Sequence, residues 1–418
     1  MSRLTVALLL LYAFAVPWQY ALDLGEPLGN VARIVGAILL IVAIPAAIAR
    51  NRWNGPGALP VLVLALFLYL SATYLWSIDP LTTLDKIRAY FQVMMVVWVG
   101  WEFLETPAHF RNLLRALLLG SIVLAALTLS GFTSAAAAVA TEQARFTASG
   151  QDPNDVARFL DLIFPIAALL VAEDDRLFFR ALAALYLPLG LLAVVLTASR
   201  GGFLGATVAF LVALFLLARW KRAAVGIASF LLAALATAAF FLVPPETFAR
   251  LATIPGQFAS LDFNDRFAIW TAGGQAFARA PWFGYGAGNY SLAAGLSAED
   301  TAHNTFMALL VMGGLVAAVL LVAILIVALR AILRRSGLVR IAFLGVLLVW
   351  IVTANVGSVE ENRMTWLIFA CFALLDRFAV DPDMPRRRVG RPAPLQQPPA
   401  MATEKLSSAF TPSTSELA

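Results

Sequence analysis

Charged residues are scarce in this 418-residue chain: they make up 13% of it, whereas 61% is hydrophobic. A soluble globular protein carries about 25% charged residues, so this composition excludes a single water-soluble domain. The excess of Lys and Arg (30) over Asp and Glu (25) gives a net charge of only +5. That excess does not indicate nucleic-acid binding, and we expect no nucleic-acid partner.

Cysteine and histidine are also rare. The single cysteine, Cys371, lies in an apolar segment, which excludes an intrachain disulfide and a cysteine-ligated metal site. An Asp-Pro-Asp sequence at 381–383 resembles the metal motif of sugar-nucleotide enzymes, but it lies in the C-terminal tail. No pair of carboxylates elsewhere has convincing metal-ligand spacing. We therefore expect neither a metal nor a cofactor.

Long apolar runs recur along the chain, each near the roughly 20 residues that cross a bilayer core. Backbone polar groups inside lipid must be satisfied within the segment, so the runs should be helices. They are continuously apolar, which argues against a β-barrel. The first run follows Arg3 without a cleavage site and is interpreted as an uncleaved helix. We predict an all-α polytopic membrane helix bundle of about twelve transmembrane helices, at 4–20, 31–49, 58–76, 89–104, 113–131, 156–172, 181–198, 203–218, 223–243, 305–328, 341–357 and 364–379.

The distribution of basic residues predicts the orientation of the bundle. With the N-terminus in the cytoplasm, about two thirds of the 30 Lys and Arg residues lie on the cytoplasmic side, as the positive-inside rule requires. Both termini are then cytoplasmic. The outer side holds the remaining basic residues: Arg33, Lys86, Arg88, Arg145, Arg158, Arg200, Arg250, Arg266, Arg279 and Arg363.

The chain divides into a membrane domain, 1–379, and a tail, 380–418. The tail is rich in Pro, Ser and Thr and has little apolar content, so it cannot bury enough surface to fold and is predicted to be disordered. Its basic cluster at 384–388 is expected to lie on anionic lipids of the cytoplasmic leaflet.

Two outer segments are long, 132–155 and 244–304. The second has about sixty residues, and connections of this length are usually functional or disordered. Its aromatic residues, Trp270, Trp282 and Tyr290 among them, argue against disorder. We predict that it forms a large periplasmic loop of short helices that cover the bundle.

Two arginines stand at turns on the outer side. Arg200 lies in the Gly-Gly turn at 197–203, either as an interfacial residue of a hairpin or as a fixed cation for a phosphate. Arg266 lies in the first turn of an expected helix that Asn264 or Asp265 can cap. A basic residue there opposes the helix dipole, so a bound anion would explain Arg266 better than capping does.

Three further motifs lie on the same side. The segment 284–290 has three glycines that permit close approach of the backbone to a ligand, but no strand precedes it, which excludes a dinucleotide site. His303 stands at the start of an expected helix. A lone histidine is more often structural, yet this one can exchange a proton near neutral pH. The last outer turn, 360–363, is either a solvated loop or a group that orients His303 or binds a sugar hydroxyl.

Taken in order, these motifs resemble the O-antigen ligase and O-antigen polymerase family. The elements that carry the resemblance are Gln151-Asp152-Pro153-Asn154, Ser199-Arg200-Gly201-Gly202, Arg266 with Trp270, the glycines 284, 286 and 288, His303-Asn304, and Gly313-Gly314. The resemblance is strongest from about 150 to 330. The order of the motifs, together with the spans and one large loop before the tenth, is more specific than any single motif.

The resemblance implies a multi-spanning glycosyltransferase of the bacterial inner membrane. Its donor would be a polyprenyl-diphosphate-linked glycan on the periplasmic side. Its acceptor would be lipid A–core oligosaccharide in a ligase or another lipid-linked glycan in a polymerase.

Physical chemistry leads to the same site residues. A diphosphate leaving group needs cations, for which Arg200 and Arg266 are the candidates. An acceptor hydroxyl needs a base, for which His303 is the candidate. We predict metal-independent transfer with inversion at the anomeric carbon. Further substrate-binding candidates are Asn304, Trp270, Arg363, Glu360, Asn154 and Arg145.

Alternatives stay open at this point. Ligation to lipid A–core is our first interpretation, but polymerisation of O-antigen or exopolysaccharide repeat units needs the same donor site. A transporter or flippase is an alternative of another class, because about twelve spans are typical of carriers. Few ionisable residues lie near mid-span, however, where coupling sites belong. A purely structural or assembly protein is the third class.

Overall fold

The computed structural model describes residues 2–25, 28–50, 53–136, 145–148, 151–221, 223, 226, 237, 241, 243–256, 266–297 and 300–379. Helices make up the regular structure of these residues, and an isolated bridge between Asp23 and Asn30 closes one short loop. The predicted all-α polytopic membrane protein is confirmed. The ninth predicted span, 223–243, falls largely outside the described residues, and the tail 380–418 falls entirely outside them.

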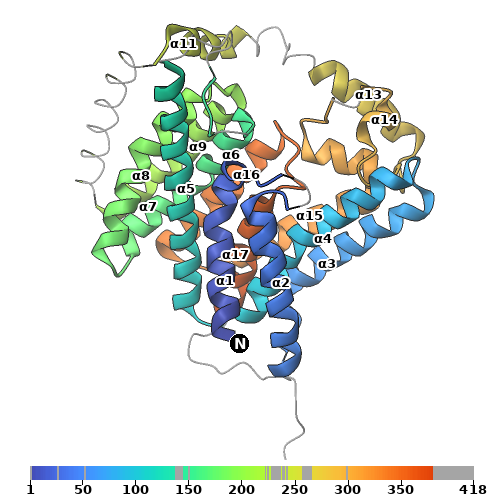
Figure 1. Ribbon diagram of the computed structural model, residues 1–418, viewed down its shortest axis with the longest axis horizontal. Coiled ribbons are helices and arrows are strands. Elements are labelled where there is room, and N and C mark those ends of the chain that lie inside the picture. The colour runs from blue at the N-terminus through green and yellow to red at the C-terminus, as the bar shows by residue number, and fades with distance from the viewer. Residues whose placement is uncertain are drawn as a thin grey trace, which may run out of the picture.

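Figure 1 shows α7, α8 and α9 on one side of the bundle and α3, α4, α13 and α14 on the other. The N-terminal half contains α1 (Ser2–Ala15), the 3-10 helix η1 (Val16–Ala21), α2 (Val31–Arg50), α3 (Ala58–Ala72), the 3-10 helix η2 (Thr73–Trp76), α4 (Pro80–Phe103), α5 (Pro107–Ala136), α6 (Pro153–Asp161) and α7 (Ile163–Glu173). The C-terminal half contains α8 (Leu177–Leu196), α9 (Arg200–Trp220), α11 (Pro245–Ala252), α13 (Arg266–Arg279), α14 (Tyr290–Ala294), α15 (Thr305–Leu333), α16 (Gly337–Ala354) and α17 (Arg363–Ala379).

Eight stretches of the described chain are long and apolar enough to cross a membrane. They comprise α1 with η1, α2, α3 with η2, α5, α8, α9, α15 and α16. Each matches one of the predicted spans closely. The described parts of 244–304 form the short helices α11, α13 and α14, which lie along the upper side of the bundle in Figure 1.

Two predicted spans have the wrong limits, for the same reason. The fourth was predicted from 89, but α4 begins at Pro80, because the Asp79 carboxylate caps it by accepting from Leu81 N and Thr82 N. The sixth was predicted as one helix over 156–172, but α6 begins at Pro153 and gives way to α7 after Asp161. An Asp cap followed by Pro at the first helical position starts both α4 and α6 in polar sequence.

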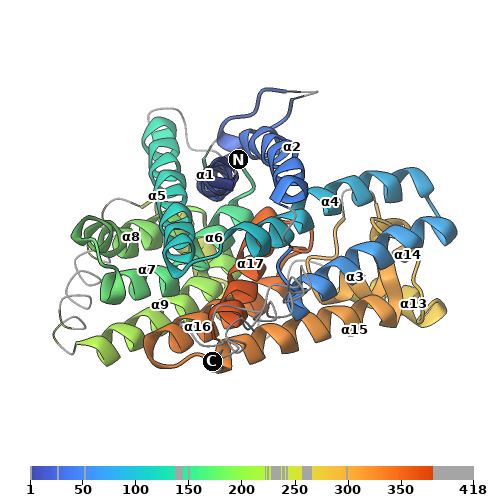
Figure 2. The same cartoon turned by 90° about the horizontal axis from the view of Figure 1, so that it is seen from below.

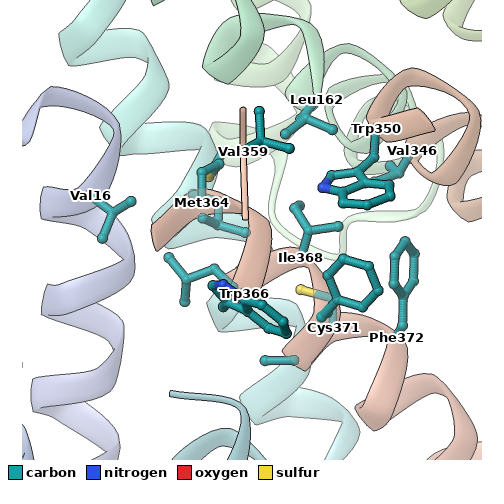
Figure 3. Packing of buried hydrophobic residues seen from close by; sticks show 14 of the residues in the cluster. Val16, Leu162, Val346, Trp350, Val359, Met364, Trp366, Ile368, Cys371 and Phe372 are labelled. Carbon is teal, nitrogen blue, oxygen red and sulfur yellow. The ribbon is translucent and has the colours of Figure 1, made fainter. Parts of the chain in front are cut away.

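Helix α17 lies in the middle of the bundle, where α4, α5 and α15 surround it (Figure 2). Nearly its whole circumference is buried, and Figure 3 shows Ile368 and Phe372 of α17 close to Trp350 of α16. The Trp350 and Phe369 rings meet edge to face with centroids 5.1 Å apart. A helix that is apolar all round is buried by its neighbours rather than facing lipid. Helix α17 is therefore the central helix of the bundle.

Two glycines let α6 and α9 approach closely. A Cβ at Gly202 would overlap the Cβ of Ala157, and one at Gly205 would overlap the carboxylate of Asp161. The contact therefore brings the first turns of α6 and α9 together. It places Asn154 and Arg158 beside the turn that carries Arg200.

We expect Gly202→Ala to destabilise the protein by about 1–3 kcal/mol, because the added methyl overpacks a helix–helix contact. Thermal unfolding in detergent measures this as a lower melting temperature. Gly274→Ala is the matched control, since a Cβ at Gly274 in α13 meets nothing within 4 Å. Equal melting temperatures for the two variants would contradict the close packing of α6 on α9.

Candidate functional site

The turn between α8 and α9 presents Arg200. Ala198 adopts a left-handed conformation (φ 49°), and the Ser199 hydroxyl then caps α9 by accepting from Gly202 N. The backbone carbonyls of the turn are held by two arginines: Arg145 Nε donates to Thr197 O (3.2 Å) and Arg250 Nε to Ala198 O (3.1 Å). These hydrogen bonds hold the turn in one conformation.

Asn154 fastens this turn to α6. Its Oδ1 accepts from the Ser199 hydroxyl (2.8 Å) and from Arg145 Nη2 (3.1 Å). The structure therefore brings the substrate-binding candidates Asn154 and Arg145 to the Arg200 turn, where they make contacts that hold it. The Arg200 guanidinium lies at the edge of the turn and donates to Thr253 Oγ1 (3.0 Å) just after α11.

A second strained turn presents His303. His303 and Ala198 are the non-glycine residues with positive φ in the described chain, and His303 has φ 45°. Asn304 caps α15 by accepting from Met307 N (3.0 Å), and Trp270 Nε1 of α13 donates to Ala302 O (2.9 Å). Strained residues of this kind cluster at functional sites. Asn304 and Trp270, both predicted to bind substrate, thus hold the turn that aims the imidazole.

The His303 ring is partly buried, and its Nδ1 lies 3.3 Å from Thr301 Oγ1. Burial lowers the pKa of His303 below its ordinary value, and the positive charges of Arg266 and Arg158 lower it further against the smaller opposing effects of Asp152 and Asp300. The imidazole is therefore neutral at neutral pH. A neutral imidazole in a cationic environment is able to accept a proton.

Arg266, Arg200 and Arg158 form one cationic group beside His303. Burial lowers the pKa of Arg266, with the charges of Arg158 and Arg200 as further causes. The Arg145 pKa is lowered in the same way, by burial first and then by Arg250 and Arg200. Mutually repelling, partly desolvated guanidinium groups are a costly arrangement that a bound polyanion would relieve.

Arg158 is a candidate site residue that the sequence pattern did not single out. Its side chain is 11% exposed, it pairs with Asp155, and it lies directly against the backbone at Gly357. Its Nε is buried and has no hydrogen-bond partner among the described residues. The signal was present in the sequence, because Asn154 and Arg158 are four residues apart and so share one face of a helix.

The glycine segment 284–290 has a structural role. Tyr285 N and Gly286 N donate to the carbonyls of Val311 and Met312 (3.1 and 2.9 Å), where α15 is kinked at Gly314 (φ 65°). A Cβ at Gly314 would overlap the backbone at Trp282. These amides are committed to α15, so the segment joins the loop to the kink of α15 rather than cradling a phosphate.

The last turn, 360–363, lies beside this site. The Glu360 side chain is buried, and burial raises its pKa to about 8, with the neighbouring charge of Glu361 as the next cause. Lys86 pairs with Glu361 (2.7 Å), and Arg363 Nη1 donates to Gln19 Oε1 (2.7 Å). The structure thus places Glu360 inside the packing and Arg363 at its edge. Among the described residues, no three His, Cys, Asp or Glu side chains are placed to share a metal ion.

The fold and this site define the class of the protein: a polytopic helical membrane protein with a histidine and several arginines gathered at one end of its bundle. Residues 185–322 match the family model of the O-antigen ligases (Wzy_C). This part of the chain is therefore similar to the O-antigen ligases, and it contains Arg200, Arg266, Trp270 and His303. The family resemblance predicted from the motifs is confirmed, and family members act on lipid-linked glycans. No curated protein matches the chain.

Proposed function

We propose that this protein transfers a glycan from a polyprenyl diphosphate to a sugar hydroxyl of lipid A–core at the periplasmic face of the bacterial inner membrane. One observation carries the proposal: a neutral imidazole, His303, lies within the electrostatic reach of Arg266 and Arg158, and Arg266 in turn lies within reach of Arg200. A proton acceptor beside a polyanion site is what a displacement of diphosphate by a hydroxyl requires.

The donor end of the site is the cationic group. As the glycosidic bond breaks, negative charge grows on the diphosphate oxygen that leaves with the lipid. Arg266, Arg200 and Arg158 stabilise that charge through bidentate hydrogen bonds and need no metal. The helices α6, α9 and α15 all begin at this site, so the positive ends of their dipoles add to the same field.

The acceptor end is His303. The acceptor hydroxyl attacks the anomeric carbon from the side opposite the diphosphate, a C–O bond forms as the bond to the diphosphate oxygen breaks, and the configuration inverts. His303 takes the hydroxyl proton. Its Nδ1 faces the Thr301 hydroxyl, which leaves Nε2 as the nitrogen that accepts this proton. The remaining candidates, Glu360 and Arg363, border the acceptor side.

The proposal includes a topology of twelve spans with both termini in the cytoplasm. To the eight apolar stretches it adds α4, the pair α6 and α7, α17 and the segment 223–243. The reason is the chain's alternation: α6, α9, α15 and α17 begin on one side, where the site lies, and the basic residues concentrate on the other.

A glycan profile of a deletion strain tests the function. If the protein is the ligase, lipopolysaccharide loses all of its O-antigen while lipid-linked polymer accumulates, and plasmid-borne wild type restores it. Accumulation of single-repeat products would instead assign the protein as a polymerase with the same donor site. Unchanged glycans would refute both assignments.

A further inference from the structure

A groove of about 530 Å³ lies between α2 and α4. These helices lie side by side in both ribbon views (Figures 1 and 2). Its walls are apolar, with Tyr12, Leu40, Phe67 and Phe91 among the lining residues. Ile41 and Phe91 on its rim are 71% and 40% exposed, so the groove opens on the outside of the bundle. On a membrane protein that surface faces lipid.

The groove is charged at one end only. Arg33 stands in the first turn of α2, Arg363 begins α17, and Arg88 lies in the third turn of α4; all three line the groove together with Gln92. The α2 and α17 N-termini are at the same end of the bundle as His303. The polarity therefore runs from guanidinium groups at the membrane boundary to aliphatic and aromatic side chains deeper in the bilayer. An anionic amphiphile has the same polarity.

The charged end of the groove lies near the candidate site. Tyr20 interacts electrostatically with Arg363, which lines the groove, and with Asp155, which belongs to α6. Tyr20 therefore lies between the groove and α6. Asp155 pairs with Arg158, which is one of the two cations that act on His303. The groove thus approaches His303 from the α2 side, whereas Arg200 and Arg266 approach it from the α9 and α13 side.

We propose that this groove seats the phosphorylated lipid anchor of the acceptor. The proposal rests on the proposed function, in which two membrane-anchored substrates must meet at one imidazole. The arginines around Arg266 provide one anionic lipid position, and the groove provides a second that is separate from it. Three arginines line the charged end of this apolar groove, and one of them, Arg88, pairs with Asp85 (2.8 Å). This arrangement complements a lipid that carries phosphate on its head group and hydrocarbon below.

Steady-state kinetics with purified protein in proteoliposomes test this assignment. The donor is undecaprenyl-diphosphate-linked glycan, and the acceptor is rough lipopolysaccharide, that is, lipid A–core without O-antigen. We expect the double variant Arg33→Gln/Arg88→Gln to raise KM for the acceptor about tenfold, as expected for lost charge-assisted hydrogen bonds, with kcat and KM for the donor unchanged. Arg334→Gln is the control, since its ion pair with Asp376 lies at the other end of the bundle. A rise in KM for the donor instead would assign the groove to the donor lipid, and wild-type kinetics would refute the proposal.

Photocrosslinking gives a readout that does not depend on turnover. A photoreactive amino acid at Ile41 should crosslink rough lipopolysaccharide in preference to undecaprenyl diphosphate, phosphatidylethanolamine and phosphatidylglycerol. The same probe at Val319, which is 63% exposed on α15 and lines no described groove, is the control. Equal labelling by phospholipids would refute the acceptor assignment. If acceptor labelling at Ile41 persists but wild type transfers no glycan, the proposed function fails while the groove assignment stands.

Discussion

His303→Asn is expected to lower the rate of glycan transfer by at least about a hundredfold, the loss typical of a missing general base, while donor binding persists. Asparagine suits the test because it tolerates the left-handed conformation that His303 adopts at φ 45°. It keeps the turn between Ala302 and the Asn304 cap while removing the proton acceptor. Transfer is measured with lipid-linked glycan and lipid A–core, and donor binding by retention of radiolabelled donor on the purified protein.

The second histidine of the chain supplies the matched control. His109 lies in the first turn of α5, far along the chain from the site and at the opposite end of the bundle in the proposed topology. His109→Asn should transfer glycan at the wild-type rate. Full turnover by His303→Asn would remove His303 from the mechanism and leave the cationic group as a binding site alone.

Loss of donor binding in His303→Asn would have a different meaning. It would indicate that the imidazole helps to bind the diphosphate instead of receiving the acceptor proton. Because burial, and after it the neighbouring arginines, lower the pKa of His303, we expect its contribution to anion binding to be small. The separation of transfer from binding is therefore the informative part of the experiment.

The sequence was a good guide to the helices because lipid imposes one rule on all of them. Apolar runs of spanning length must be helical, and the runs now seen as α2 and as α3 with η2 were predicted to within one residue at each end. Hydropathy fails where a helix begins in polar residues. The first turns of α4 and α6 are polar, and their Asp-Pro starts, Asp79-Pro80 and Asp152-Pro153, were the local signal that could have located them.

Part of the site was predicted from the sequence. The part that was not predicted depends on how the helices pack against one another. Arg200, Arg266 and His303 each stand at a turn or helix start, which sequence patterns can indicate. The place of Arg158 depends on how closely α6 packs on α9 through Gly202 and Gly205, a distance that no local pattern encodes. The glycines near 286 were ambiguous for a similar reason, since the partners of their amides lie on α15.

Arg158→Gln is expected to lower transfer by about 10²–10³-fold, the loss typical when one preorganised donor to a developing anion is removed. Substitution of Arg158 is a strong test because its charge acts both on Arg266, at the donor end of the site, and on His303, at the acceptor end. The variant should bind donor more weakly, since one of three cations is gone. It should also change the pH dependence of kcat/KM.

The sign of the pH effect follows from the electrostatics. The positive charge of Arg158 disfavours protonation of His303 and so lowers its pKa. Without that charge the pKa of His303 rises, the base becomes protonated at higher pH, and the acid limb of the kcat/KM profile moves upward in pH. Arg158→Lys keeps the charge, so it should keep the wild-type acid limb while losing the bidentate contact to the diphosphate.

Asp155→Asn separates this role from a structural one, because it breaks the ion pair with Arg158 and leaves the arginine in place. If Arg158 merely anchors α6, Asp155→Asn and Arg158→Gln should show the same loss of transfer, with no shift in the acid limb. If Arg158 acts on donor and base together, Asp155→Asn should stay near wild type and only Arg158→Gln should shift the profile. The shift is decisive, since a misfolded site loses rate at every pH, whereas a missing positive charge changes the pH at which His303 can accept a proton.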